Sequence, residues 1–155
     1  MYIIIGASSF IGVYTADEFL KQNCEIIVTG RKNKFKEHYD SLGVEYINLD
    51  LTQPQDFEKL PKSGVDGVIL LGGLLPANAP VNLDYDENAA EYFQVNTIGT
   101  INVLEYCRKN GIQRVISNCS YADVRGAWGK KTITEDDPRD FIYTGDHAVY
   151  VFSKN

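Results

Sequence analysis

The sequence GASSFIG at residues 6–12 joins an apolar run, Tyr2 to Ile5, to a segment of helical period. In that position Gly6 suits a tight turn and Gly12 lets a helix pack closely on a sheet. The unpaired N–H groups at the start of the helix suit a pyrophosphate. Ser9 stands where the dinucleotide-binding pattern prefers glycine, although its hydroxyl could itself bond a phosphate oxygen. A plain strand-to-helix turn is the alternative.

Short runs rich in isoleucine and valine alternate with helical segments along the chain. This alternation predicts repeated βαβ units and an α/β fold, a Rossmann-type doubly wound parallel sheet of about five strands. Strands are expected at Tyr2–Ile5, Glu25–Thr29, Val44–Asn48, Gly67–Leu71 and Arg114–Ser117. The length of 155 residues fits one dinucleotide-binding domain, residues 1–155.

Two segments carry the clearest helical period. The first, Ile11–Gln22, is expected to place one set of residues on a single face: Ile11, Thr15, Phe19 and Leu20. The second, Ala89–Asn110, is the longest expected helix and carries Phe93, Ile98, Ile101, Leu104 and Tyr106. Two long connections, residues 72–86 and 120–146, are expected to be functional, because loops of that length inside a compact domain are seldom idle.

Composition excludes several classes of protein. The net charge is −6 and the basic residues are scattered, which argues against a nucleic-acid partner. No apolar run is long enough for a membrane span, and the first residues lack the pattern of a secretory signal. The three cysteines show no metal-binding or redox spacing, so we expect reduced thiols, no metal site and a cytoplasmic location.

The end of the second expected strand reads Gly30-Arg31-Lys32. An enzyme that uses NAD usually places an acidic residue here to hold the ribose 2′-hydroxyl. Glycine followed by Arg31 suits a 2′-phosphate better, because a guanidinium meets phosphate in bidentate geometry. The sequence therefore favours NADP over NAD. A solvated basic turn is the alternative.

Several segments together resemble the extended short-chain dehydrogenases, the NAD(P)-dependent epimerase/dehydratase family that acts largely on nucleotide sugars. Residues 6–12 are similar to the family's GxxGxxG, and residues 95–105, VNTIGTINVLE, to its VNxxGTxNVLE stretch. The resemblance implies that Asp50 and Leu51 face the adenine and that small residues after the fourth strand pass under the cofactor. The implied cofactor-binding residues are Gly6, Ser8, Ser9, Phe10, Ile11, Gly12, Arg31, Asp50, Leu51, Leu71, Gly72, Gly73, Asn96, Tyr150 and Lys154.

The resemblance also implies catalysis by a hydroxyl residue with Tyr150 and Lys154, which match the family's YxxxK pair. Positions i and i+4 share a helix face, so the ammonium would lie near the phenol. A nearby positive charge lowers a tyrosine pKa from about 10, which would let Tyr150 act as a general base. Counting forward from the fifth strand places the catalytic hydroxyl at Ser120, and counting back from residues 124–126 places it at Tyr121. We take Ser120, because loop length changes more easily than strand length.

The family's 4,6-dehydratases carry Thr-Asp-Glu where this chain has Ser120-Tyr121-Ala122-Asp123, which disfavours dehydration although Asp123 could still reach the site. Relatives of this type run to about twice this length, so the resemblance implies the N-terminal part of such an enzyme, without turnover by itself and with a possible homodimer. A non-catalytic dinucleotide-binding regulator or sensor is the second hypothesis. A Rossmann-type domain for another adenine ligand is the third.

Overall fold

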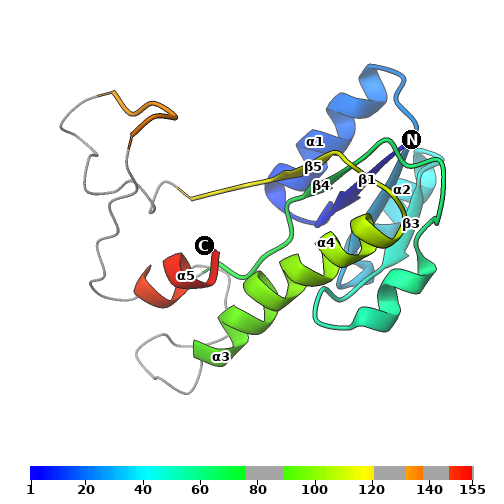
Figure 1. Ribbon diagram of the computed structural model, residues 1–155. Helices are drawn as coiled ribbons and strands as arrows, with labels where there is room; N and C mark the ends of the chain where they lie inside the picture. The colour runs from blue at the N-terminus through cyan, green and yellow to red at the C-terminus, as the bar shows by residue number, and fades with distance from the viewer. Residues whose placement is uncertain (76–88, 121–131, 138–146, 155) are drawn as a thin grey trace. The chain divides into compact units, whose positions relative to one another are not determined.

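The computed structural model describes residues 1–75, 89–120, 132–137 and 147–154. The chain groups into two compact units, residues 1–73 with 98–118 and residues 74–97 with 119–155. The first unit contains every strand of the sheet drawn in Figure 1, and the second contains the short helices α3 and α5.

The first unit is built on a five-stranded parallel sheet with the strand order β3-β2-β1-β4-β5. The strands are β1 (Tyr2–Ile5), β2 (Ile26–Gly30), β3 (Glu45–Asn48), β4 (Gly67–Leu70) and β5 (Val115–Ser117). The predicted Rossmann-type sheet is confirmed, and each predicted strand agrees with the observed one to within one residue at either end. Because the strand order reverses between β1 and β4, their carboxyl ends form the crevice where ligands bind in this class of sheet.

Helices and turns connect these strands. They are α1 (Phe10–Lys21), the 3-10 turn η1 (Asn33–Phe35), α2 (Lys36–Ser41), the 3-10 segment η2 (Pro54–Lys59) and α4 (Gly99–Lys109). Gly12 and Ala16 are the buried residues of α1. Ile11, which was expected to share the face of Phe19, is instead 56% exposed, because the small residues on the adjacent face let α1 approach the sheet.

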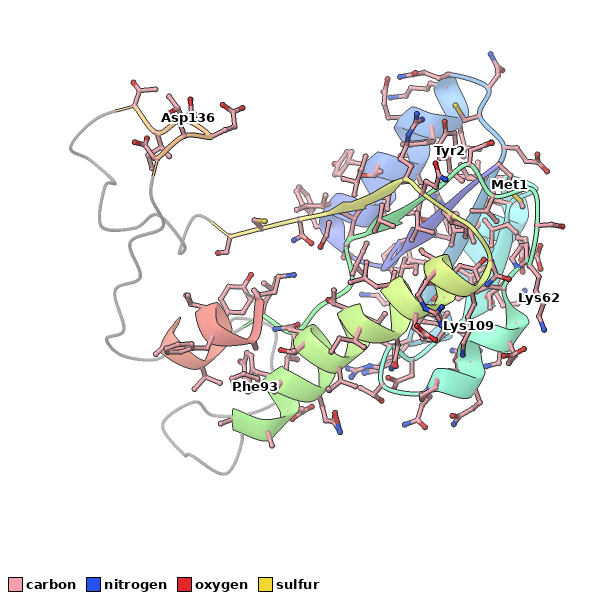
Figure 2. All side chains as sticks on the ribbon, in the orientation of Figure 1. Met1, Tyr2, Lys62, Phe93, Lys109 and Asp136 are labelled. Carbon is pink, nitrogen blue, oxygen red and sulfur yellow. The ribbon has the colours of Figure 1, made fainter. Side chains whose placement is uncertain are left out.

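The single helix predicted over Ala89–Asn110 is divided into three elements: α3 (Ala89–Tyr92), the π-helical segment η5 (Phe93–Ile98) and α4. Of the five apolar residues expected on it, Tyr106 is buried, whereas the other four are between 42% and 52% exposed; the side chain of Phe93 is labelled in Figure 2. Gly99 and Val103 form the buried face of α4, since a Cβ on Gly99 would lie 2.8 Å from the Cβ of Leu51.

The second unit has its own small core. Leu74, Tyr92 and Tyr150 form a buried cluster, with Val95 and Val149 packed against it. Tyr150 lies on α5 (His147–Lys154), and Tyr92 ends α3. Among the residues that the structure describes, every helix is too short or too polar to cross a membrane.

Candidate functional site

The turn after β1 brings two main-chain segments into direct contact. Gly6 has a φ of +92°, a conformation that residues with a side chain rarely adopt. A Cβ on Gly6 would overlap the backbone nitrogen of Gly72 and lie 2.6 Å from its Cα. Gly72 itself donates its N–H to the carbonyl of Ile5 at 3.0 Å. The carboxyl ends of β1 and β4 therefore meet as bare main chain, with no side chain between them.

Ser9 caps the helix that follows this turn. Its hydroxyl accepts the N–H of Gly12 at 3.0 Å and donates to the carbonyl of Gly6 at 2.8 Å. A Cβ on Gly12 would overlap that same carbonyl oxygen. Ser9 thus uses its hydroxyl to close the turn in the position where the dinucleotide-binding pattern prefers glycine.

A buried tyrosine holds the other side of the turn. The hydroxyl of Tyr39, on α2, donates to the carbonyl of Ala7 at 2.8 Å. Tyr39 is fully buried, and this burial raises its pKa to about 12. The N–H of Ala7 is in turn bound by the carbonyl of Thr29 on β2. The turn is therefore fixed from β2 and α2 before any ligand arrives.

Gly30, the last residue of β2, lies beside two hydroxyl groups. A Cβ at this position would overlap the hydroxyl oxygen of Tyr46 and lie 2.7 Å from the Oγ of Ser8. Arg31 follows as an exposed residue, and its carbonyl accepts the side-chain N–H of Asn48 at 3.1 Å. The basic side chain predicted to meet a 2′-phosphate therefore extends from an anchored backbone.

Asp50 and Leu51 follow β3 and have different roles: one makes polar contacts in the turn and the other packs in the apolar interior. The carboxylate of Asp50 accepts the N–H and the hydroxyl of Thr52, at 2.9 and 2.8 Å, and so shapes the turn. Leu51 is buried, its carbonyl accepts the side-chain N–H of Asn102 at 2.8 Å, and its Cδ1 would lie 3.1 Å from a Cβ on Gly72. Leu51 thereby supplies an apolar wall close to Gly72.

The glycine turn and the start of α1 together fit the pyrophosphate of a dinucleotide. At Gly6 and Gly12 the main chain packs so closely on other backbone atoms that neither position could carry a Cβ. The 12-residue helix α1 begins directly after this glycine turn with a capped N-terminus. This combination fits a pyrophosphate group. Phe10 and Ile11 lie apart from the buried turn: both are exposed and line an apolar groove of about 500 Å³ along α1.

In the second unit, Asn96 connects three segments that are distant in sequence. Its Oδ1 accepts the N–H of Leu74 at 2.7 Å, and its Nδ2 donates to the Leu74 carbonyl at 3.1 Å and to the Oγ of Ser153 at 2.9 Å. Thr97 donates to the Ser153 carbonyl at 2.8 Å. Asn96 is 3% exposed. The π-helical segment that carries it is a type of distortion that often marks functional sites.

Tyr150 and Lys154, the predicted general base and its lysine, both lie on α5. Tyr150 is buried against Leu74 and Tyr92, and Lys154 is half-buried one helical turn later. Ser120 is half-buried in the segment after β5. Tyr121, Asp123 and residues 124–126 lie outside the described residues, so the choice between Ser120 and Tyr121 stays a prediction.

Three hydroxyl residues with structural roles near the candidate site could not be predicted from the sequence: Tyr39, Tyr46 and Ser153. Each acts through one hydroxyl group that contacts the backbone or a polar side chain of another segment. A tyrosine in a strand or a serine in a helix gives no signal of such a contact in a single sequence. Within the described residues, no group of histidine, cysteine or acidic side chains could hold a metal ion.

Comparisons with known proteins agree with this geometry. Residues 2–138 match the sequence model of the NAD dependent epimerase/dehydratase family. The chain is 27% identical to a putative UDP-glucose 4-epimerase of Methanocaldococcus jannaschii, covering 99% of this chain and 51% of that protein. It is 30% identical to a decarboxylating sterol-4-alpha-carboxylate 3-dehydrogenase of Mus musculus, covering 87% and 34%.

Among solved structures, the fold is similar to that of the UDP-glucose 4-epimerase of Thermus thermophilus in complex with NAD. The TM-score is 0.79 at 22% identity, over 99% of this chain and 47% of that one. The chain thus spans about half, or less, of the length of the relatives that it matches.

Proposed function

This chain belongs to the NAD-dependent epimerase/dehydratase family, and on that basis we propose that it is the cofactor-binding part of an NAD(P)-dependent enzyme acting on a nucleotide sugar. The observation that carries the proposal is the contact of Gly6 with Gly72 at the switch point of the sheet. The relatives named as UDP-glucose 4-epimerases support the substrate class. We also propose that residues 1–155 form one dinucleotide-binding domain.

The residues proposed to hold the dinucleotide lie mostly in the first unit. The N–H groups at the start of α1 would bind the pyrophosphate, and Asp50 and Leu51 would face the adenine. Leu71, Gly72 and Gly73 would lie under the cofactor, and Asn96, Tyr150 and Lys154 would complete the set. We propose NADP over NAD, because the strand end carries Gly30 and the exposed Arg31 in place of an acidic side chain.

The proposed chemistry is oxidation of a substrate hydroxyl with general-base help. Tyr150 takes the hydroxyl proton onto its phenolic oxygen, Lys154 favours the phenolate by its charge, and Ser120 donates a hydrogen bond to the same substrate oxygen. The bound nicotinamide supplies the hydride acceptor. Dehydration is disfavoured, because the acidic residues of the 4,6-dehydratases are replaced here by Tyr121 and Ala122.

We propose further that this chain binds its cofactor without turning over substrate, in the cytoplasm and with self-association. Three exposed apolar residues support the last point: Ile98 at the end of η5, and Ile101 and Leu104 on the first turns of α4. Size measurement in solution, compared with a variant carrying Ile101→Lys, tests it. A monomer at all concentrations would contradict self-association.

Titration calorimetry with NAD and NADP tests the central proposal. We expect binding of at least one cofactor and a preference for NADP; binding of neither would refute cofactor binding. The Tyr150→Phe variant of a protein extended to the length of its relatives should lose turnover and keep cofactor affinity. If that variant keeps full function, the chain is instead a non-catalytic dinucleotide sensor.

A further inference from the structure

Gly30 occupies the position from which many NAD-binding sheets present an acidic side chain to the adenosine ribose. In this protein the space beside Gly30 is already filled. A Cβ on Gly30 would overlap the hydroxyl oxygen of Tyr46, and it would lie 2.7 Å from the Oγ and 3.1 Å from the Cβ of Ser8. The glycine is therefore required by its neighbours, and no side chain fits at position 30 while Tyr46 keeps its place.

Two contacts hold Tyr46 in that place, a stacked ring and a hydrogen bond. Tyr46 is 8% exposed, and its ring stacks on the ring of Tyr39 with centroids 5.9 Å apart and planes 22° from parallel. Its hydroxyl donates to the carbonyl of Lys32 at 2.5 Å, in the turn after β2. Tyr39 is itself anchored to Ala7 in the turn after β1. Moving Tyr46 aside would disturb both turns that border the crevice.

We propose that Tyr46 is a specificity-determining residue, whose hydroxyl bars an acidic side chain from position 30 and so sets the choice between the two nicotinamide dinucleotides. This inference rests on the proposed cofactor binding. The two groups that a Cβ would meet are both hydroxyls: that of Tyr46 already donates to the Lys32 carbonyl, and that of Ser8 could donate to a 2′-phosphate. A carboxylate at the same point would repel that phosphate and would accept from a 2′-hydroxyl.

The test compares four proteins: the parent chain, Gly30→Asp, Gly30→Asp with Tyr46→Phe, and Gly30→Asp with Tyr39→Phe. The last is the matched control, because it removes a buried hydroxyl from the same cluster without freeing space at Gly30. Thermal unfolding midpoints are measured without ligand, and the affinities for NAD and NADP are measured by calorimetry.

We expect Gly30→Asp alone to lower the unfolding midpoint and to weaken both cofactors. Tyr46→Phe should restore the midpoint in part and shift the NADP-to-NAD affinity ratio towards NAD by about tenfold, the value of one hydrogen bond to a charged group. The Tyr39→Phe control should restore neither. A single Gly30→Asp variant with the parent midpoint, or equal behaviour of the two double variants, would overturn the inference.

Failure of the proposed function gives a different pattern. If the parent chain binds neither dinucleotide, cofactor binding is refuted whatever the unfolding midpoints show. If the parent binds and the midpoints follow the expected order, but the affinity ratio stays fixed across the variants, Tyr46 only fills space and the specificity role is refuted.

Discussion

The backbones of Gly6 and Gly72 approach so closely that a Cβ on Gly6 would overlap the Gly72 nitrogen. This single relationship joins the ends of β1 and β4 at the point where the strand order reverses. It also removes side chains from the place where a pyrophosphate would lie. The stability of the fold and the proposed binding therefore depend on the same two residues.

Gly6→Ala should consequently damage both properties. The added methyl group meets backbone atoms that cannot rotate away, and φ is +92°, so we expect a loss of about 2–4 kcal/mol in unfolding free energy and loss of dinucleotide binding. Urea unfolding and calorimetry measure the two effects. Gly43→Ala is the control: it has a φ of +69° but open space around it, so it should cost about 1 kcal/mol and leave binding unchanged. Equal losses in the two variants would show that φ alone matters.

Ser9→Ala should weaken the start of α1. The variant loses the hydroxyl that accepts the Gly12 N–H and donates to the Gly6 carbonyl, at a cost of about 0.5–2 kcal/mol. Ser41→Ala removes an exposed hydroxyl bonded to the His38 carbonyl and should change stability by less. Urea unfolding of the two variants against the parent makes the comparison. An effect of Ser9→Ala no larger than that of Ser41→Ala would contradict the capping role.

Asn96→Leu should destabilise the second unit. It leaves the buried N–H and carbonyl of Leu74 without the side-chain amide that now bonds them, and it removes the bond from Asn96 to the Ser153 hydroxyl, which still donates to the Tyr150 carbonyl. Each buried unsatisfied group costs about 1–3 kcal/mol, so the variant should lose helix α5 first. Limited proteolysis near residues 147–154 measures this loss. Gln94→Leu, at an exposed position of the same π-helical segment, is the control. Cleavage that is equally fast in both variants would argue against the role of Asn96.

Stability should fall steeply in the alkaline range. Burial raises the pKa values of Tyr39 and Tyr106 to about 12, above the value near 10 in an unfolded chain. Between about pH 10 and 12 the unfolded state releases these protons while the folded state keeps them, so stability present below pH 10 is lost as the pH rises. Each group contributes a slope of at most about 1.4 kcal/mol per pH unit. Urea unfolding across this range should show a smaller slope for Tyr106→Phe than for the parent. An unchanged slope would mean that Tyr106 does not contribute.

The strands and the glycine turn could be predicted from the sequence because their signals are local. Isoleucine and valine runs mark β1 and β2, and Gly6 and Gly12 mark the turn between β1 and α1. The buried face of the long helix could not be predicted in the same way. Val103 is buried and Ile101 is 52% exposed, although both are apolar, because the contact of Gly99 with Leu51 sets which face is covered.

The hydroxyl contacts of the site were equally hidden from the sequence. The sequence shows only that position 30 carries no acidic residue. The structure adds a steric reason for the glycine, because the Tyr46 hydroxyl lies where a side chain at position 30 would begin. That cause depends on β3 lying beside β2 in one register, with Gly30 opposite Asn48. The contact between Tyr46 and Gly30 is therefore determined by the pairing of two strands that are separated in sequence, and residue types alone do not predict it.

The bonds of Asn96 have one more consequence, for hydrogen exchange. The amide proton of Leu74 is held by Asn96, and Asn96 is held by Ser153, so the Leu74 amide and helix α5 should open in a single cooperative event. Its exchange rate thus reports the opening of a helix at the other end of the chain. One well-resolved amide signal near β4 is enough to follow the order of the segment that carries Tyr150.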